Sequence, residues 1–226
     1  MFGSTRSLAA PGISLATRII ATAVLIGCLV SLPQSARAQL TLKEMADQRE
    51  SVTAFLEGYL AENWDLDEAD AARIAGWVTD YSLKHETDPF VQMARILKES
   101  RGRHFLPSRG GEARVKRGSH HEIGLSQIMP SWIGKTVGGK TLSREMLFSE
   151  EGNLEAGILI YKRYDDGDAK MALARYNYPG ARRPNRYALS VWRIYEGIWA
   201  AFDEFQANPA IYASLGRRVP AGVFLP

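Results

Sequence analysis

The chain has 226 residues, of which 28 are Lys or Arg, 25 are Asp or Glu and one is Cys. Residues 1–38 contain Arg6, Arg18 and Arg37 and no acid, so the rest of the chain holds 25 basic and 25 acidic residues. This balance gives no reason to expect a nucleic-acid partner. The only cysteine is Cys28, so residues beyond it offer no disulfide, thiol nucleophile or thiolate metal site.

Residues 1–38 have the features of an export signal. An acid-free start precedes an apolar stretch from Ile19 to Leu32, and Ala36-Arg37-Ala38 fits a small-x-small cleavage site. We therefore expect cleavage after Ala38 and a periplasmic protein. Leu25-Ile26-Gly27-Cys28 also resembles a lipoprotein cleavage box, which would anchor the protein by a lipid on Cys28. We favour signal cleavage because the apolar run continues past Cys28.

Helical patterns dominate the remaining chain. Hydrophobic residues at i+3 and i+4 spacings predict a first helix over 42–64. Asp67 is a candidate N-cap for a second helix that runs to about His85. Asp88-Pro89 is a strong start signal for a third helix, because Asp caps helices and Pro suits the first turn. This third helix is expected to end near Glu99-Ser100.

Glycine and proline residues interrupt the stretch 101–123, which we interpret as a loop with at most a small β-hairpin or irregular lobe. Helical patterns return over 130–136, 149–164 and 168–176, and Pro184 is expected to open the last long helix. Strand signals are otherwise sparse. The predicted fold class is therefore mainly α.

Five short motifs occur in a fixed order in the second half of the chain. They are Ile96–Ser100, Pro107-Ser108, Gly124–Pro130, Asn153–Gly157 followed by Tyr161, and Ala172–Asn177 ending at Pro179-Gly180. In their order and approximate spacing, these motifs resemble the catalytic domain of the soluble lytic transglycosylase family over roughly residues 85–200. Each motif alone is weak, and the ordered set carries the resemblance.

The resemblance implies a lysozyme-like, mostly helical fold. We expect a catalytic domain over 85–205, with an N-terminal helical segment over 39–84 packed on it and an irregular tail over 206–226. The resemblance also implies cleavage of the β-1,4 bond between N-acetylmuramic acid and N-acetylglucosamine in peptidoglycan. Glu99 would be the single general acid/base, and the sugar's own C6 hydroxyl would attack C1 to give a 1,6-anhydromuramyl end. No second acid lies inside the matched motifs near Glu99.

Two hydroxyl-bearing residues are expected beside Glu99 on the strength of the resemblance. Ser108 would hydrogen-bond the catalytic carboxyl, and its structural alternative is a turn residue. The Tyr176 hydroxyl would reach Glu99 or the acetamido group of the sugar. Its alternative is a structural hydrogen bond made by a buried tyrosine.

Three further residues complete the expected substrate-binding set. The Gln127 amide suits sugar N-acetyl or hydroxyl groups, with a structural hydrogen bond as the alternative. Met129 would form a wall of the cleft, and a plain core position is the alternative. Asn177 follows Tyr176 in its motif. Asn153 also matches the family pattern, but we interpret it as a residue that caps or orients a helix.

The sequence departs from the family in two places. Ser126 stands where the family usually has Met, and the stretch between Ser108 and Gly124 is longer than in compact members. That stretch contains His120-His121-Glu122, whose adjacent histidines lack the i, i+4 spacing of a zinc motif. We therefore expect no metal and no other cofactor.

Two other functions stay open. One is a lysozyme-type hydrolase, in which water attacks in place of the C6 hydroxyl. The other is a wall-binding component of an envelope assembly with little catalysis of its own. In each case the ligand would be the glycan strands of peptidoglycan. We expect the protein to be a monomer. The chain is small and has no added wall-binding repeat, which favours a role beside a secretion, pilus or flagellar assembly.

Overall fold

The structure, a computed structural model, describes residues 40–64, 66–103, 105, 106 and 114–208. The expected export signal, Cys28, Ser108 and most of the tail lie outside these residues. The described residues from Leu40 onward belong to one compact unit. Eight α-helices lie within them, so the prediction of a mainly α fold is confirmed.

Three helices form the N-terminal part: α2 (Leu42–Asp47), α3 (Arg49–Trp64) and α4 (Glu68–Lys84). The single helix predicted over 42–64 is wrong, because Gln48 leaves the helical conformation with φ −105° and ψ 23°. The hydrophobic spacing continues across this break, which is why periodicity did not reveal it. Asp67 caps α4 as expected, since its side chain accepts a hydrogen bond from the backbone N–H of Asp70.

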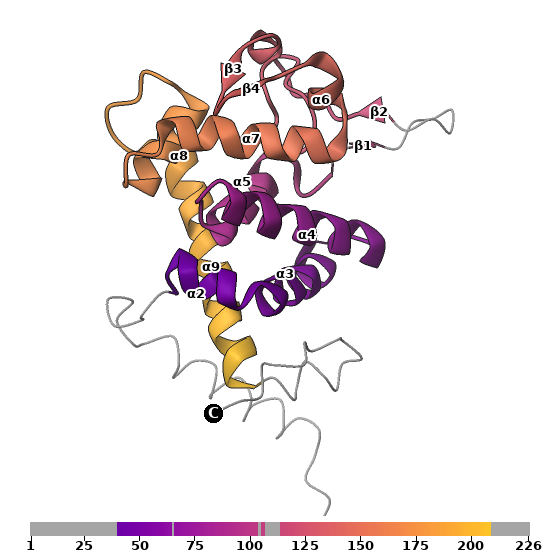
Figure 1. Ribbon diagram of the computed structural model, residues 1–226, viewed down its shortest axis with the longest axis vertical. Coiled ribbons are helices and arrows are strands. Elements are labelled where there is room, and N and C mark those ends of the chain that lie inside the picture. Colours follow the sequence, from indigo (N-terminus) through magenta and orange to yellow (C-terminus); the bar gives the residue numbers. More distant parts are fainter. Residues whose placement is uncertain (1–39, 65, 104, 107–113, 209–226) are drawn as a thin grey trace, which may run out of the picture. The chain divides into compact units, whose positions relative to one another are not determined.

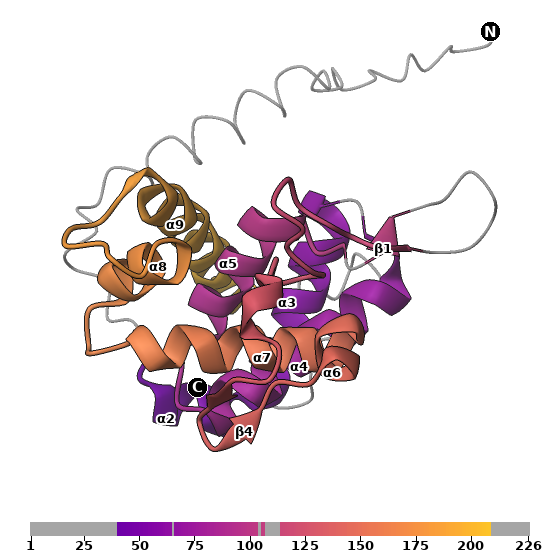
Figure 2. The same ribbon diagram turned by 90° about the horizontal axis from the view of Figure 1, so that it is seen from above.

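Helix α5 (Pro89–Ser100) lies in the middle of the helices and packs against α4 and α9 (Figures 1 and 2). Asp88 caps it by accepting the backbone N–H of Phe90 at 2.7 Å, as the Asp-Pro signal predicted. The helix ends at Arg101, whose φ of 58° is left-handed, followed by Gly102 at φ 69°. A side chain at Gly102 would lie 2.7 Å from Leu66, so the chain turns here against the N-terminal helices.

Two small sheets accompany the helices. Strands β1 (Phe105–Leu106) and β2 (Arg114–Val115) pair antiparallel, where the small hairpin was expected. Strands β3 (Thr136–Val137) and β4 (Lys140–Thr141) form a second antiparallel pair, which was not predicted. The helix predicted over 130–136 is wrong: only a 3₁₀ turn is present, over Pro130–Trp132.

The second half of the chain is again helical, with α6 (Arg144–Phe148), α7 (Glu150–Tyr164), α8 (Ala169–Asn177) and α9 (Arg186–Ala207). Helices α7 and α8 agree with the predicted ranges, and α6 was not predicted. Helix α9 begins after Asn185, whose side chain accepts the backbone N–H of Ala188, so Pro184 lies just outside the helix.

Two hydrophobic clusters hold these elements. The larger one joins residues of α2 to α5 with residues of α7 to α9, so the N-terminal helices and the later ones share one core. Aromatic rings of α3, α5 and α9 meet edge to face inside it, among them Phe55, Phe90 and Phe202. The smaller cluster packs α6, α7 and the β3–β4 hairpin together. Helix α7 contributes to both clusters.

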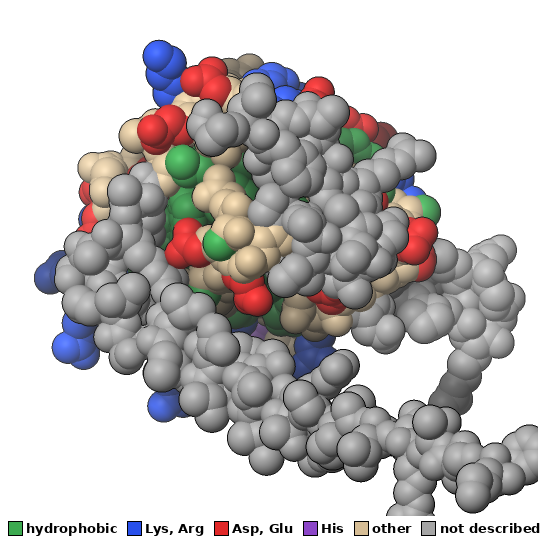
Figure 3. All heavy atoms as spheres, turned by 90° about the horizontal axis from the view of Figure 1, so that it is seen from below, with side chains coloured by type: hydrophobic (Ala, Val, Ile, Leu, Met, Phe, Trp, Pro, Cys, Tyr) green, Lys and Arg blue, Asp and Glu red, His purple; other side chains and the backbone are tan. Residues whose placement is uncertain are grey.

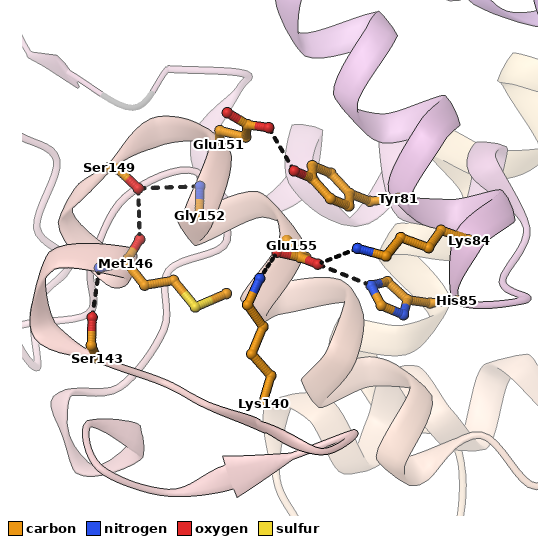
Figure 4. Close-up of polar contacts among 10 residues, drawn as sticks. All are labelled: Tyr81, Lys84, His85, Lys140, Ser143, Met146, Ser149, Glu151, Gly152 and Glu155. Atoms are coloured by element: carbon orange, nitrogen blue, oxygen red, sulfur yellow. Dashed lines mark hydrogen bonds and ion pairs between the residues drawn. The ribbon is translucent and has the colours of Figure 1, made fainter.

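A polar cluster ties α4 and β4 to α7 (Figure 4). The Glu155 carboxylate is bound by Lys84 Nζ at 3.1 Å, His85 Nε2 at 3.3 Å and Lys140. Burial alone would raise the pKa of Glu155, but the hydrogen bonds from these three side chains outweigh it and lower the pKa. Glu155 is therefore an ionised structural residue.

Seen from below in Figure 3, the visible described surface is mixed, with acidic and hydrophobic side chains near the middle and Lys and Arg side chains toward the edges of the view. No helix within the described residues is long and apolar enough to cross a membrane.

Candidate active site

Glu99 lies in the last turn of α5, where its side chain is partly exposed. The Tyr187 hydroxyl donates a hydrogen bond to Glu99 Oε1 at 2.5 Å. Tyr187 stands in the first turn of α9, so the contact joins the end of one helix to the start of another. The carboxyl thus has a fixed neutral donor on one oxygen.

The surroundings of Glu99 favour its protonated form. Burial raises the pKa of Glu99, and the negative charge of Glu122 raises it further. The Tyr187 hydrogen bond and the positive charges of Arg95 and Lys98 act in the opposite direction without cancelling the rise. A carboxyl of this kind holds a proton closer to neutral pH than an exposed glutamate does, which suits a general acid.

Tyr176 is the neighbour that the resemblance placed beside Glu99, and its hydroxyl is engaged elsewhere. It donates to the backbone carbonyl of Ser126 at 2.7 Å and accepts from Arg95 Nη1 at 3.0 Å. The Arg95 guanidinium also lies over the Tyr176 ring, 4.8 Å from its centre. The contact with Glu99, one of the two roles expected for Tyr176, is therefore made by Tyr187 instead. Tyr176 makes the structural hydrogen bond that was its alternative and positions the loop that contains Ser126.

That loop, residues 123–128, is a closed turn held by α7. The backbone of Ile123 and Ile128 exchanges two hydrogen bonds, at 2.9 and 3.0 Å. Asn153 accepts the Ser126 N–H at 2.8 Å and donates to the Ile123 carbonyl at 2.9 Å. A side chain at Gly157 would lie 2.3 Å from Ser126 Oγ, so only glycine permits this contact. The Asn153–Gly157 motif thus has a structural explanation, and Asn153 orients the loop.

Gln127 and Met129 differ in exposure: Gln127 is half-buried and Met129 is exposed. Gln127 has a left-handed φ of 45°, and its amide donates to the Gly124 carbonyl at 2.7 Å. Its side chain oxygen lies beside Gly118, where an added Cβ would be 2.7 Å away. Met129 is 42% exposed, which excludes the core position considered for it.

Glu122 is an acid that sequence reasoning did not place near Glu99. Partial burial raises its pKa, but hydrogen bonds from the backbone of Glu122 and His120 outweigh this and lower it. The His120 N–H lies 2.9 Å from its carboxylate. Its charge acts on Glu99, so the folded chain brings an acid from outside the matched motifs near Glu99.

Asn177 and Lys116 complete the surroundings. Asn177 is exposed at the end of α8, and its oxygen accepts from Asn185 at 3.5 Å, which joins α8 to the start of α9. Lys116 donates from Nζ to the Ser100 carbonyl at 2.9 Å, at the C-terminal end of α5. A cation there is favourable for the helix dipole. The expected role of Ser108 falls on a residue outside those that the structure describes.

Tyr187, Arg95 and Glu122 are the three site residues that the sequence did not indicate. Tyr187 and Arg95 look in sequence like ordinary helix residues, and Glu122 looks like part of a solvated loop. The N-cap signal of Asn185 could have placed Tyr187 in a first helical turn. Nothing in the sequence paired it with a residue 88 positions earlier.

The arrangement combines a carboxyl with a raised pKa, a hydroxyl donor, the half-buried amide of Gln127 and the exposed thioether of Met129. It can donate a proton to a polar ligand and take one back. Within the described residues, no three His, Cys, Asp or Glu side chains are grouped as metal ligands. A scan against protein-family models, a search of curated proteins and a search of solved structures each found no match to this chain.

Proposed function

We propose that the protein is a peptidoglycan lytic transglycosylase with a lysozyme-like fold and Glu99 as its general acid/base. The observation that carries the proposal is the carboxyl of Glu99, which has a raised pKa and a hydroxyl donor at the end of the central helix. The loop 123–128 beside it carries the motif that resembles this family. The order of the five motifs is the sequence evidence for this family, and the geometry around Glu99 is compatible with it.

In the proposed reaction, Glu99 gives its proton to the oxygen that leaves the muramyl C1. The resulting carboxylate keeps the Tyr187 hydrogen bond, which stabilises the negative charge. The C6 hydroxyl of the same muramyl residue then attacks C1, and its proton returns to Glu99. One glycosidic bond breaks, one intramolecular ether bond forms, and no water is consumed.

Product analysis tests this proposal directly. Purified protein is incubated with peptidoglycan, and the soluble products are separated and weighed by mass spectrometry. A transglycosylase gives muramyl ends that are lighter by one water than reducing ends. Products with reducing muramic ends alone would refute the proposed reaction.

The lysozyme-type hydrolase is the second candidate, and Glu122 is the observation that favours it. Its pKa is lowered while that of Glu99 is raised, and two carboxyls with pKa values moved apart in this way are what ordinary glycosidases use as base and acid. Its hydrogen bond from the His120 N–H and its contact with the His120 ring hold it within its own loop. Glu122→Gln should remove activity if Glu122 activates water and should retain most activity if the C6 hydroxyl attacks.

This function places the protein where the wall is, in the periplasm, which is consistent with the interpretation of residues 1–38 as an export signal. Action beside an envelope-spanning secretion, pilus or flagellar assembly is part of the same proposal. Co-purification of such a complex from solubilised envelopes tests it, and a protein that always purifies alone would count against it.

A further inference from the structure

A basic pocket of about 980 Å³ lies beside the end of α5. Its walls come from the C-terminal ends of α3 and α5, from residues on either side of the β1–β2 hairpin, and from α9. Five of the residues that line it are cationic, and none of the described lining residues is Asp or Glu. The cations are Lys98, Arg101, Arg103, Lys116 and Arg193.

The basic pocket adjoins the candidate active site through two helices. Lys98 and Ser100, which line it, are the chain neighbours of Glu99. On α9, Ser190 and Ile194 line it, and they follow Tyr187 at i+3 and i+7, on the same face of the helix. A ligand bound near Glu99 and Tyr187 therefore has this pocket as its neighbour.

The positive charges in the pocket lie close to one another. Burial, followed by the charges of Arg101 and Arg103, lowers the pKa of Lys116. Lys98, Arg101 and Arg193 are exposed and form no ion pair with an acid in the described part of the chain. Like charges held together in this way repel one another, and a bound anion with several charges relieves the repulsion.

The same pocket has an apolar side. Trp64, Leu97 and Ile194 line it together with the cations. An inorganic anion would use only the charges, whereas a peptide with carboxylates and small apolar side chains would use both surfaces. The volume also suits a short peptide better than a single ion.

We propose that the basic pocket binds the acidic stem peptide carried by the muramyl residue next to the bond that is cut. This inference rests on the proposed function, since it takes peptidoglycan as the substrate. The stem is attached to the sugar that reacts at Glu99, and it presents several carboxylates on a short chain with alanine methyl groups. Arginine and lysine side chains bind such carboxylates by charge-assisted hydrogen bonds.

Direct binding tests the inference without any turnover. A free stem tetrapeptide ending in D-alanine is titrated into the full protein by calorimetry, at low and at high salt. We expect binding that weakens with salt, and a loss of about ten-fold in affinity in the double variant Lys98→Ala/Arg193→Ala. The matched control Lys43→Ala/Arg163→Ala removes two exposed cations outside the pocket and should bind as the unmodified protein does.

Two comparison peptides make the test decisive. The tetrapeptide with its carboxylates converted to amides should not bind, and equal binding of this form would overturn the inference. An unrelated acidic tetrapeptide should bind at least several-fold more weakly. If it binds equally well, the pocket is a site for an acidic segment of a protein partner, and the stem assignment is wrong.

The proposed function can fail or stand independently of the pocket. Glycan strands stripped of their stems by an amidase still contain the bond that Glu99 would cut. Anhydro products from these strands together with no stem binding would refute the pocket inference alone. Stem binding with no anhydro product from any strand would refute the proposed reaction and leave the peptide site.

Discussion

Glu99 and Glu155 are both withdrawn from solvent, and their pKa values move in opposite directions. Glu155 is the more buried of the two, at 3% exposure, yet its pKa is lowered. Glu99 is partly exposed and its pKa is raised. Burial disfavours the charged form of each, and the partners outweigh it at Glu155 but not at Glu99.

The partners of Glu155 are two lysines and a histidine, while the closest partner of Glu99 is a neutral hydroxyl. Three cationic or ionisable donors keep a carboxylate ionised and turn it into a structural tie between α4, α7 and β4. The Tyr187 hydroxyl and the more distant charges of Arg95 and Lys98 do not offset the effect of burial, so the pKa of Glu99 stays raised. The partners of Glu155 therefore make it a structural anion, whereas those of Glu99 leave its pKa raised.

The largest expected effect is that of Glu99→Gln. The amide keeps the shape and can still accept the Tyr187 hydrogen bond, but it has no proton to give. We expect wall-degrading activity to fall by about 10² to 10⁴-fold with little change in thermal stability. Release of soluble muropeptides measures the activity, and retained activity in a folded variant would refute the role of Glu99.

Glu155→Gln is expected to lower stability and to leave activity unchanged. It removes the common partner of Lys84, His85 and Lys140, but the two lysines are 60% and 48% exposed and stay solvated. We therefore expect a loss of about 1–3 kcal/mol in the free energy of unfolding, with activity per folded molecule retained. Urea unfolding followed by circular dichroism measures it, and an unchanged midpoint would show that the cluster is not a structural tie.

Tyr187→Phe should change the titration of Glu99 more than the fold. The Tyr187 hydrogen bond lowers the pKa of Glu99, so its loss should raise that pKa and move the alkaline limb of the pH–activity profile upward. We expect activity at the optimum to fall about ten-fold.

Tyr176→Phe is the matched control for this variant, because its hydroxyl binds Arg95 and the Ser126 carbonyl. It should cost about 1–2 kcal/mol of stability and leave the alkaline limb in place. A shift of the limb in the Tyr176 variant and none in the Tyr187 variant would reverse our assignment.

The smallest effect is a difference in how stability depends on pH. The lowered pKa of Glu155 means that its stabilising contribution is present above its ordinary value of 4.5 and is lost as the pH falls through the folded-state pKa. The raised pKa of Glu99 means that its contribution is present below 4.5 and is lost as the pH rises through the folded-state pKa.

Melting temperatures of the unmodified protein and the two Gln variants, measured from acid to neutral pH, test these signs. The advantage of the unmodified protein over Glu155→Gln should grow as the pH rises, and its advantage over Glu99→Gln should shrink. Parallel curves for the two variants would mean that the two carboxyls titrate alike.

Local features such as helix caps could be predicted from the sequence. Contacts between residues far apart in the chain could not. The Asp67 cap and the Asp88-Pro89 start were found because a cap depends on residues within one turn. The five residues of α6 and the two-residue strands of the β3–β4 hairpin are too short to show a period. The break at Gln48 interrupts no hydrophobic pattern.

The site shows the same division. Glu99 could be predicted because it lies in a motif at a helix end. Its hydroxyl donor could not, because Tyr187 is 88 residues away and the pairing depends on how α5 packs against α9. For Tyr176 the predicted contact with Glu99 is absent and the structural alternative is present, because its hydroxyl binds Arg95 and the Ser126 carbonyl, which lie 81 and 50 positions away in the chain.

Helix α5 carries two contacts that fix the spacing of the site. Arg95 meets Tyr176 of α8, and Glu99, one turn later, meets Tyr187 of α9. Each residue of a helix turns the chain by about 100°, so one residue inserted between them would swing Glu99 away from Tyr187 while Arg95 stayed in place. The helix therefore fixes the spacing and the relative direction of these two contacts. Over this single turn, a change in the number of residues is a more severe change than a substitution of any one of them.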